Sequence, residues 1–315
     1  MPTVGPVPLR LATRSSPLAR WQADHVARLL RAGHPGLDVE LVLLTSAPDK
    51  DLATPISELG GKGLFAKEVQ EAVLDGRADL AVHSAKDLPS QTVPGLVLAA
   101  VPERGDPRDV LVGSPLVDLP VGAVVATGSN RRRVQLQDLR PDLRFVELRG
   151  NIQRRVATAG TLVEDGPHAG ERITAVIAAG VALLRQDLEA RIGDWLPDYV
   201  MTPQVGQGAL AVECRADDEA TLTLLQVIEH GPSRRRVDAE RSFLVVLGGD
   251  CDLPAGAHAT LADPDDATSE ITLRMVVGTD DGTRLERAVI RGSDPERIGA
   301  DGIALLPVHE LLGPR

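Results

Sequence analysis

Apolar positions in the first part of the chain alternate between short continuous runs and helical spacing. Runs bounded by turn residues predict strands at 9–13, 39–45 and 79–83. Apolar residues three or four apart predict helices at 18–30 and near 65–73, where Phe65, Val69, Ala72 and Val73 share one face. Because strands and helices alternate, this segment predicts a parallel sheet with helices on both faces.

The same alternation begins again after a charged, proline-containing stretch at 102–109, which we interpret as a crossing between two α/β units. It predicts strands at 122–127, 144–148 and 173–178, and helices at 131–139, from 152 and behind 178. A second crossing is expected at 201–203, followed by one more strand at 209–214.

From residue 220 the pattern differs. Helical stretches at 220–230 and 234–247 lead to a Gly/Asp/Pro loop at 248–254. Alternating segments follow at 257–261, 271–277 and 285–291, and a helical stretch at 303–312 closes the chain. This order predicts an antiparallel sheet with helices, a smaller α+β domain.

Composition limits what the protein binds. The 315 residues include 34 basic and 45 acidic side chains, a net charge of −11, and only three Phe, two Trp and one Tyr. Nucleic-acid affinity depends on neutralised phosphates and stacked aromatic rings, so we expect no nucleic-acid partner. The sequence shows no apolar run of membrane-span length, no signal-peptide core and no metal-ligand spacing, and its two cysteines build no disulfide framework. We expect a cytoplasmic protein with no membrane partner and no metal.

Basic residues gather where predicted strands end. Thr127-Gly-Ser-Asn-Arg-Arg-Arg133 joins a strand to a helix, and helix N-termini attract anions. Leu148-Arg-Gly-Asn151, with Arg155 one turn later, follows the next strand, and Arg14 ends the first strand. Since ligands bind at the carboxyl ends of strands in open α/β sheets, these arginines predict a site for carboxylates or phosphates. For each segment alone, a solvated helix face with ordinary surface arginines is the alternative.

Three further features could carry chemistry. His83-Ser-Ala-Lys-Asp87 ends a strand, and its Asp87 carboxylate could stabilise a developing cation or form only a surface salt bridge. Gly60-Gly-Lys-Gly63 is typical of a mobile loop. Cys214 lies in an apolar strand and is expected in the core, whereas Cys251 lies in a loop and could be reactive or modified.

Together these segments resemble the porphobilinogen deaminase (hydroxymethylbilane synthase) family over almost the whole chain. The resemblance rests on Leu11-Ala-Thr-Arg-Ser-Ser-Pro-Leu-Ala19, Gly60-Gly-Lys-Gly-Leu-Phe65, Ala78-Asp-Leu-Ala-Val-His-Ser-Ala-Lys-Asp-Leu-Pro89, Leu148-Arg-Gly-Asn151, Val205-Gly-Gln-Gly-Ala209, and Cys251 with its glycines and Pro254. It implies an α/β protein with two periplasmic-binding-protein-like α/β domains and a smaller α+β C-terminal domain. The implied domains are 1–103 with 205–220, 104–204, and 221–315.

The family's reaction joins four porphobilinogen molecules head to tail into hydroxymethylbilane, with loss of ammonia at each step, in haem and other tetrapyrrole biosynthesis. The chain grows on a dipyrromethane cofactor bonded by a thioether to a cysteine, which here matches Cys251. The resemblance implies that Asp87 is the catalytic carboxylate, because a fixed anion stabilises the cationic azafulvene left by ammonia loss. The acetate and propionate groups of every pyrrole explain the arginine clusters.

The resemblance also implies the remaining site residues and partners. Cofactor contacts match Lys86, Asp87, Ser129, Arg131, Arg132 and Gly150, and substrate contacts match Arg14, Ser16, Lys62, Phe65, Arg149 and Arg155. The expected protein is a monomer whose product is used by uroporphyrinogen III synthase.

Three positions depart from the family pattern. Gly128 replaces a Ser, Leu183 stands where an Arg is usual, and Thr45-Ser-Ala-Pro-Asp49 replaces Thr-x-Gly-Asp. If Leu183 faces the substrate, Leu183→Arg should restore a carboxylate contact. These departures leave a catalytically weakened relative open as an alternative. The second alternative is a non-catalytic protein of the same fold that binds a small anion.

Overall fold

The computed structural model describes residues 8–45, 66–248 and 253–313. The chain divides into two compact units, Met1–Arg104 with Ala209–Arg234, and Gly105–Gly208 with Arg235–Arg315. The first unit contains one five-stranded sheet, and the second contains a five-stranded and a three-stranded sheet. Two α/β sheets and a smaller α+β part confirm the predicted fold class. In the described ranges, no helix combines the length and the apolar character needed to cross a bilayer.

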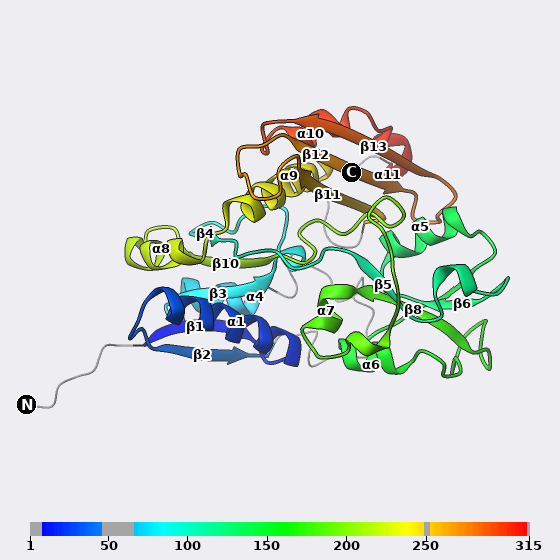
Figure 1. Ribbon diagram of the computed structural model, residues 1–315, viewed down its shortest axis with the longest axis horizontal. Helices are drawn as coiled ribbons and strands as arrows, with labels where there is room; N and C mark the ends of the chain where they lie inside the picture. The colour runs from blue at the N-terminus through cyan, green and yellow to red at the C-terminus, as the bar shows by residue number, and fades with distance from the viewer. Residues whose placement is uncertain (1–7, 46–65, 249–252, 314–315) are drawn as a thin grey trace, which may run out of the picture. The chain divides into compact units, whose positions relative to one another are not determined.

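The sheet of the first unit has the strand order β2-β1-β3-β10-β4 (Figure 1). Its strands are β1 (Leu9–Arg14), β2 (Val39–Leu44), β3 (Leu80–Ser84), β4 (Leu96–Ala100) and β10 (Leu210–Arg215). Its helices are α1 (Pro17–Gly33), α4 (Lys67–Leu74) and α8 (Glu219–Leu225), with short 3-10 turns η1 (Ala85–Asp87) and η4 (Gln226–Ile228).

The three strands predicted from the alternating pattern of this unit are parallel, as predicted, but the sheet as a whole is mixed. β1 runs parallel to β2 and β3, but β10 runs antiparallel to β3 and β4. The reason is where β10 starts: Ala85 N, just after β3, donates to Ala209 O at 3.0 Å. A strand that begins beside the end of β3 has to run back along it.

Helices cover both faces of this sheet, as the apolar spacing predicts. Pro17 occupies the first turn of α1 and Ser16 Oγ accepts from Ala19 N at 3.3 Å, so the helix begins directly after β1. Leu30 of α1 packs in one apolar cluster with inward residues of β1, β3 and β10. Val73 of α4 belongs to a separate cluster, formed with the alternate residues of β1 and β3.

The five-stranded sheet of the second unit has the order β7-β6-β8-β5-β9. Its strands are β5 (Asp109–Gly113), β6 (Val124–Ala126), β7 (Arg144–Val146), β8 (Ile173–Ala179) and β9 (Ile192–Trp195). Its helices are α5 (Asn130–Leu139), α6 (Ile152–Ala157) and α7 (Gly180–Leu184), with 3-10 turns η2 (Leu116–Asp118) and η3 (Glu189–Arg191). β6 is parallel to β7 and β8, whereas β5 is antiparallel to β8 and β9, so this sheet is also mixed.

The three-stranded sheet is an antiparallel meander of β11 (Ala255–Leu261), β12 (Ile271–Gly278) and β13 (Leu285–Gly292). Its helices are α9 (Gly231–Leu247), α10 (Ile298–Ile303) and α11 (Val308–Leu312). The closing helix predicted at 303–312 is in fact two helices, because Pro307 lacks the backbone N–H that a continuous helix needs. Phe243 of α9 is fully buried in one apolar cluster with the inward residues of the meander.

Candidate functional site

In the first unit, predicted site residues lie at the edge where two parallel strands end. Ala12 of β1 pairs in register with Ala81 of β3, so Arg14 lies level with the end of β3. The turn η1 follows β3 immediately. This edge carries four of the predicted residues, Arg14, Ser16, Lys86 and Asp87.

The Asp87 carboxylate is half-buried and has no hydrogen-bond or ion-pair partner within the described residues. Backbone bonds hold the turn that carries it: Ala85 N donates to Ala209 O at 3.0 Å, and Leu88 N donates to Ala85 O at 3.4 Å. The carboxylate is therefore fixed by its backbone and available to a ligand's cationic group.

His83 lies in β3, four residues before Asp87, and its side chain is more deeply buried than that of Asp87. Its Nε2 lies 3.1 Å from Glu213 Oε2, and the two side chains are 4% and 3% exposed. Gln70 Nε2 donates to the same oxygen at 2.8 Å. His83 is thus a buried structural residue, as its place in an apolar strand indicates.

In the second unit, Arg131 and Arg132 surround one buried carboxylate. Arg131 Nη1 donates to Asp109 Oδ2 at 2.8 Å and to Thr202 O at 2.6 Å. Arg132 Nε donates to Asp109 Oδ1 at 3.0 Å, and Gln207 Nε2 reaches the same oxygen at 2.9 Å. Asp109 is 0% exposed, and Arg131 and Arg132 are 2% and 6% exposed. The alternative of a solvated helix face therefore does not apply to these two arginines.

This cluster carries more positive than negative charge. Burial alone raises the pKa of Asp109, but the guanidinium groups of Arg131 and Arg132 outweigh burial and hold that pKa at about 2. Arg131 Nε and Nη2 are buried and have no hydrogen-bond partner among residues 8–45, 66–248 and 253–313. Buried N–H donors without acceptors are costly, and two guanidinium groups share one carboxylate. The arrangement favours an anionic ligand with acceptor oxygens.

The neighbouring loops after β6 and β7 touch each other. A Cβ at Gly128 would lie 2.5 Å from Leu148 O, so a Ser at this position would need the backbone to move. Gly128 therefore accommodates a close approach of the two loops. Ser129 occupies the N-cap position before α5, and its hydroxyl makes no capping bond to the first N–H groups of that helix.

The loop after β7 is held by its own arginines. Gly150 has φ +97°, a conformation that favours glycine, and its carbonyl accepts from Arg155 Nε at 2.7 Å. Arg149 Nε donates to Glu147 Oε1 at 3.0 Å. Ser129, Arg149, Gly150 and Arg155 all follow the carboxyl ends of β6 and β7, as predicted.

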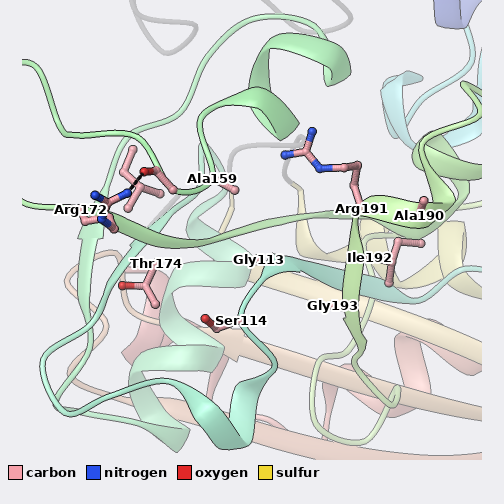
Figure 2. A pocket seen from close by; sticks show the side chains of 11 residues that line it. Gly113, Ser114, Ala159, Arg172, Thr174, Ala190, Arg191, Ile192 and Gly193 are labelled. Carbon is pink, nitrogen blue, oxygen red and sulfur yellow. Dashed lines mark hydrogen bonds between the residues drawn. The ribbon is translucent and has the colours of Figure 1, made fainter.

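A pocket of about 450 Å³ lies at the opposite end of this sheet (Figure 2). It is lined by the end of β5 and the beginnings of β8 and β9, and includes Ser114 and Thr174. Its arginines, Arg172 and Arg191, are exposed and donate to the carbonyls of Gly160 and Val156. No predicted site residue lines this pocket.

The sequence interpretation missed Asp109, Gln207 and Thr202 as parts of the site. In the sequence, Asp109 is the last residue of the charged crossing at 102–109, and Gln207 is one residue of the motif Val205-Gly-Gln-Gly-Ala209. Neither was predicted to be a site residue. One signal could have identified Asp109: it is an acidic residue at the start of an apolar run, in a unit whose predicted sheet has arginines at one edge. That signal does not identify the arginines with which Asp109 forms ion pairs.

Two family models match the chain and together cover most of it. Residues 9–223 match "Porphobilinogen deaminase, dipyromethane cofactor binding domain", and residues 234–305 match "Porphobilinogen deaminase, C-terminal domain". The chain belongs to the porphobilinogen deaminase family.

Solved structures of other proteins show distant likeness only. YhfZ from Shigella flexneri is 16% identical, with a TM-score of 0.35, and the match covers 78% of this chain and 98% of that one. A nutrient binding protein from Burkholderia cenocepacia bound to methionine is 14% identical, with a TM-score of 0.40, and the match covers 70% of this chain and 90% of that one. These likenesses have no bearing on function.

The residues of the second unit fit the cofactor that the family description names. The family's dipyrromethane carries carboxylates, and Arg131 offers two buried donor nitrogens that have no acceptor among the described residues, beside a surplus positive charge. Lys62, Phe65 and Cys251 lie outside the described residues. Cys214 is fully buried, and burial raises the pKa of its thiol to about 11, so it is the core residue that the sequence predicts.

At the position where porphobilinogen deaminases usually have an Arg, Leu183 is 0% exposed and packs in the apolar cluster of β5, β6 and β8. It does not face a ligand site, so the expected gain of a carboxylate contact from Leu183→Arg is withdrawn. Arg185 is also buried, and its Nη2 donates to Gly208 O at 2.8 Å. Burial lowers the pKa of Arg185 to about 10.

Leu183→Arg is instead expected to destabilise the second unit. An unpaired charge in an apolar cluster lowers the free energy of unfolding by about 4 kcal/mol or more. Urea unfolding followed by circular dichroism measures the change. Leu184→Arg, at a neighbour that is 37% exposed, is the matched control and should change little. An unchanged midpoint for Leu183→Arg would contradict the buried position.

Proposed function

We propose that this protein is an active hydroxymethylbilane synthase, which joins four porphobilinogen molecules head to tail with loss of ammonia at each addition. The observation that carries the proposal is the match of porphobilinogen deaminase models to residues 9–223 and 234–305. The first matched range contains Asp87 and both arginine loops, and the second contains the Cys251 loop.

Asp87 is the proposed catalytic carboxylate. Loss of ammonia from porphobilinogen leaves a positive charge, and a fixed anion stabilises that charge most when it needs no reorganisation. Asp87 suits this role because backbone bonds fix its turn while its carboxylate is partner-free within the described residues. Lys86, Arg14 and Ser16 lie at the same sheet edge and are proposed contacts of the cofactor or of substrate carboxylates.

Cys251 is the proposed attachment point of the dipyrromethane, which supplies the pyrrole end on which the chain grows. Cys251 precedes Gly256 by five positions in the sequence, and an extended chain spans at most about 3.6 Å per residue, so the attached group starts within about 18 Å of Gly256. A Cβ at Gly256 would lie 2.9 Å from Arg131 Cδ. The described chain that follows the proposed attachment point therefore contacts one of the arginines proposed to hold the cofactor's carboxylates.

The proposal is tested by the intact mass of the purified protein. We expect the mass of the chain plus one dipyrromethane, and a colour reaction of the protein with Ehrlich's reagent. Adding porphobilinogen should then give species that are heavier by one to four substrate units. A protein without added mass that gains none on incubation with porphobilinogen would contradict the proposal, and would favour a non-catalytic anion-binding relative.

The arginine cluster gives a separate prediction. A charge-assisted hydrogen bond in a sheltered site contributes about 1.5–3 kcal/mol, so Arg132→Leu is expected to slow cofactor assembly or chain growth roughly 10- to 100-fold. Mass spectrometry should show partly extended intermediates accumulating. Arg172→Leu, an exposed arginine of the same unit, is the control and should leave growth unchanged.

Arg133→Leu is a second control for Arg132→Leu, at the next residue of α5. Its guanidinium donates to Asp280 O and, at 3.1 Å, to Gln137 Oε1, so it holds the turn after β12 rather than Asp109. We expect Arg133→Leu to affect chain growth much less than Arg132→Leu. Equal, negligible effects of both substitutions would remove the arginine cluster from the proposal.

A catalytically weakened relative is the second candidate, favoured by the burial of Leu183 at a usual arginine position. It predicts slow addition with normal cofactor attachment, which the same mass measurements distinguish. We further propose a cytoplasmic monomer organised as domains 1–103 with 205–220, 104–204 and 221–315. Its product would be consumed by uroporphyrinogen III synthase.

A further inference from the structure

One buried carboxylate organises the arginines of the second unit. Asp109, the first residue of β5, accepts from Arg131 through Oδ2 and from Arg132 and Gln207 through Oδ1, at 2.8, 3.0 and 2.9 Å. Arg132 Nη2 also lies 2.8 Å from Oδ1. Both carboxylate oxygens are thus used by side chains that approach from α5 and from the segment before β10.

The same carboxylate sets the charge of the cluster. Asp109 stays ionised at neutral pH, because the two guanidinium groups hold its pKa at about 2. Two guanidinium groups and one carboxylate leave a single positive charge, which matches one ligand carboxylate. Without Asp109, two buried cations would face each other with no fixed counter-charge.

Gln207 connects this carboxylate to the chain segments around it. Its Nε2 also donates to Pro107 O at 2.7 Å, two residues before Asp109.

Thr202 holds the other side of the cluster: its carbonyl O accepts from Arg131, and its N donates to Gln135 Oε1 at 2.8 Å. Within the part of the chain that the structure describes, the guanidinium of Arg131 is therefore fixed through Nη1, while its Nε and Nη2 lack partners.

We propose that Asp109 is a positioning residue of the anion site: it fixes both guanidinium groups and reduces their combined charge to one. The inference rests on the proposed function, in which the bound anion is a pyrrole carboxylate. Asp109 itself does not touch the ligand in this proposal. It acts by directing Nε and Nη2 of Arg131 away from itself, toward the ligand.

Chemical rescue tests this role. Asp109→Ala removes a carboxylate and leaves space for formate, so we expect substrate addition to slow about 10- to 100-fold and to recover saturably with added formate. Chloride at equal ionic strength should not restore addition. Asp142→Ala is the matched control, because Asp142 accepts from Arg140 Nε and Nη2 at 2.8 Å in a half-exposed pair of the same unit. Its addition rate should not respond to formate.

A second variant guards against loss of folding. Asp109→Asn keeps the size of the side chain and one acceptor oxygen but removes the charge, and we expect a folded protein with slowed addition. Wild-type addition rates in Asp109→Asn would overturn the inference. If the wild-type protein adds substrate, a formate response of Asp109→Ala that is confined to the thermal midpoint would also overturn the inference, because Asp109 would then be needed only for stability.

The inference and the proposed function can fail separately. If the wild-type protein never gains substrate mass, the proposed function fails. The formate dependence of the thermal midpoint of Asp109→Ala then still tests the counter-charge, and an absent formate effect there overturns the inference as well. If wild-type protein elongates and Asp109→Ala elongates equally well without formate, only the inference fails.

Discussion

Asp87→Asn is expected to lower turnover of porphobilinogen by about 10²–10³-fold, because one preorganised electrostatic contact is worth about 2.7–4 kcal/mol in a transition state. The substitution keeps the shape of the side chain and removes its charge. The turn that carries it depends on backbone bonds of Ala85 and Leu88, which an Asn leaves intact. Binding of the first substrate should therefore survive while its addition slows.

Single-turnover mass spectrometry separates these two effects, since it reports bound and added substrate independently of product release. Asp75→Asn is the matched control, because Asp75 is an exposed acid of the same unit that pairs with Arg77. We expect the control to keep wild-type rates. Near-normal addition in Asp87→Asn would exclude Asp87 as the catalytic carboxylate.

Cys251→Ser is expected to abolish covalent cofactor attachment altogether. A hydroxyl is a far weaker nucleophile than a thiolate, so the variant should keep the mass of the bare chain and give no colour with Ehrlich's reagent. Leu247 and Leu253, on either side of the loop, are buried in the apolar cluster of the small sheet. Substitution of one loop residue should therefore leave the fold intact, with an unchanged thermal midpoint.

Cys214→Ser is the control for this experiment. Cys214 is fully buried in β10, and burial raises the pKa of its thiol to about 11, so little thiolate is present at neutral pH. The control should retain the added mass. Loss of the mass in Cys214→Ser and its retention in Cys251→Ser would reverse the assignment.

The sequence predicted most elements of the fold because their signals are local. The apolar face of α1, its capping Ser16 and the run that forms β1 are all readable within a few residues. β4, β5 and β9 were missed, since short apolar runs beside proline- and glycine-rich segments have no distinctive period. The direction of β10 could not be predicted either. β10 is antiparallel to β3 because of where the chain re-enters the sheet, and no residue of β10 indicates this direction.

The candidate site divides in the same way. The sequence by itself determined that arginines follow strand ends, that Asp87 lies in a turn after β3, and that Cys214 is a core residue. Only the tertiary structure placed Asp109 between Arg131 and Arg132, which follow it by 22 and 23 residues, and buried Leu183 in the core. Helical and strand periods act over neighbouring residues, whereas burial and ion pairing depend on which distant segments meet. The chemical type of each site residue is therefore known from the sequence alone. The net charge of the site and the hydrogen-bond donors available in it depend on the folded chain.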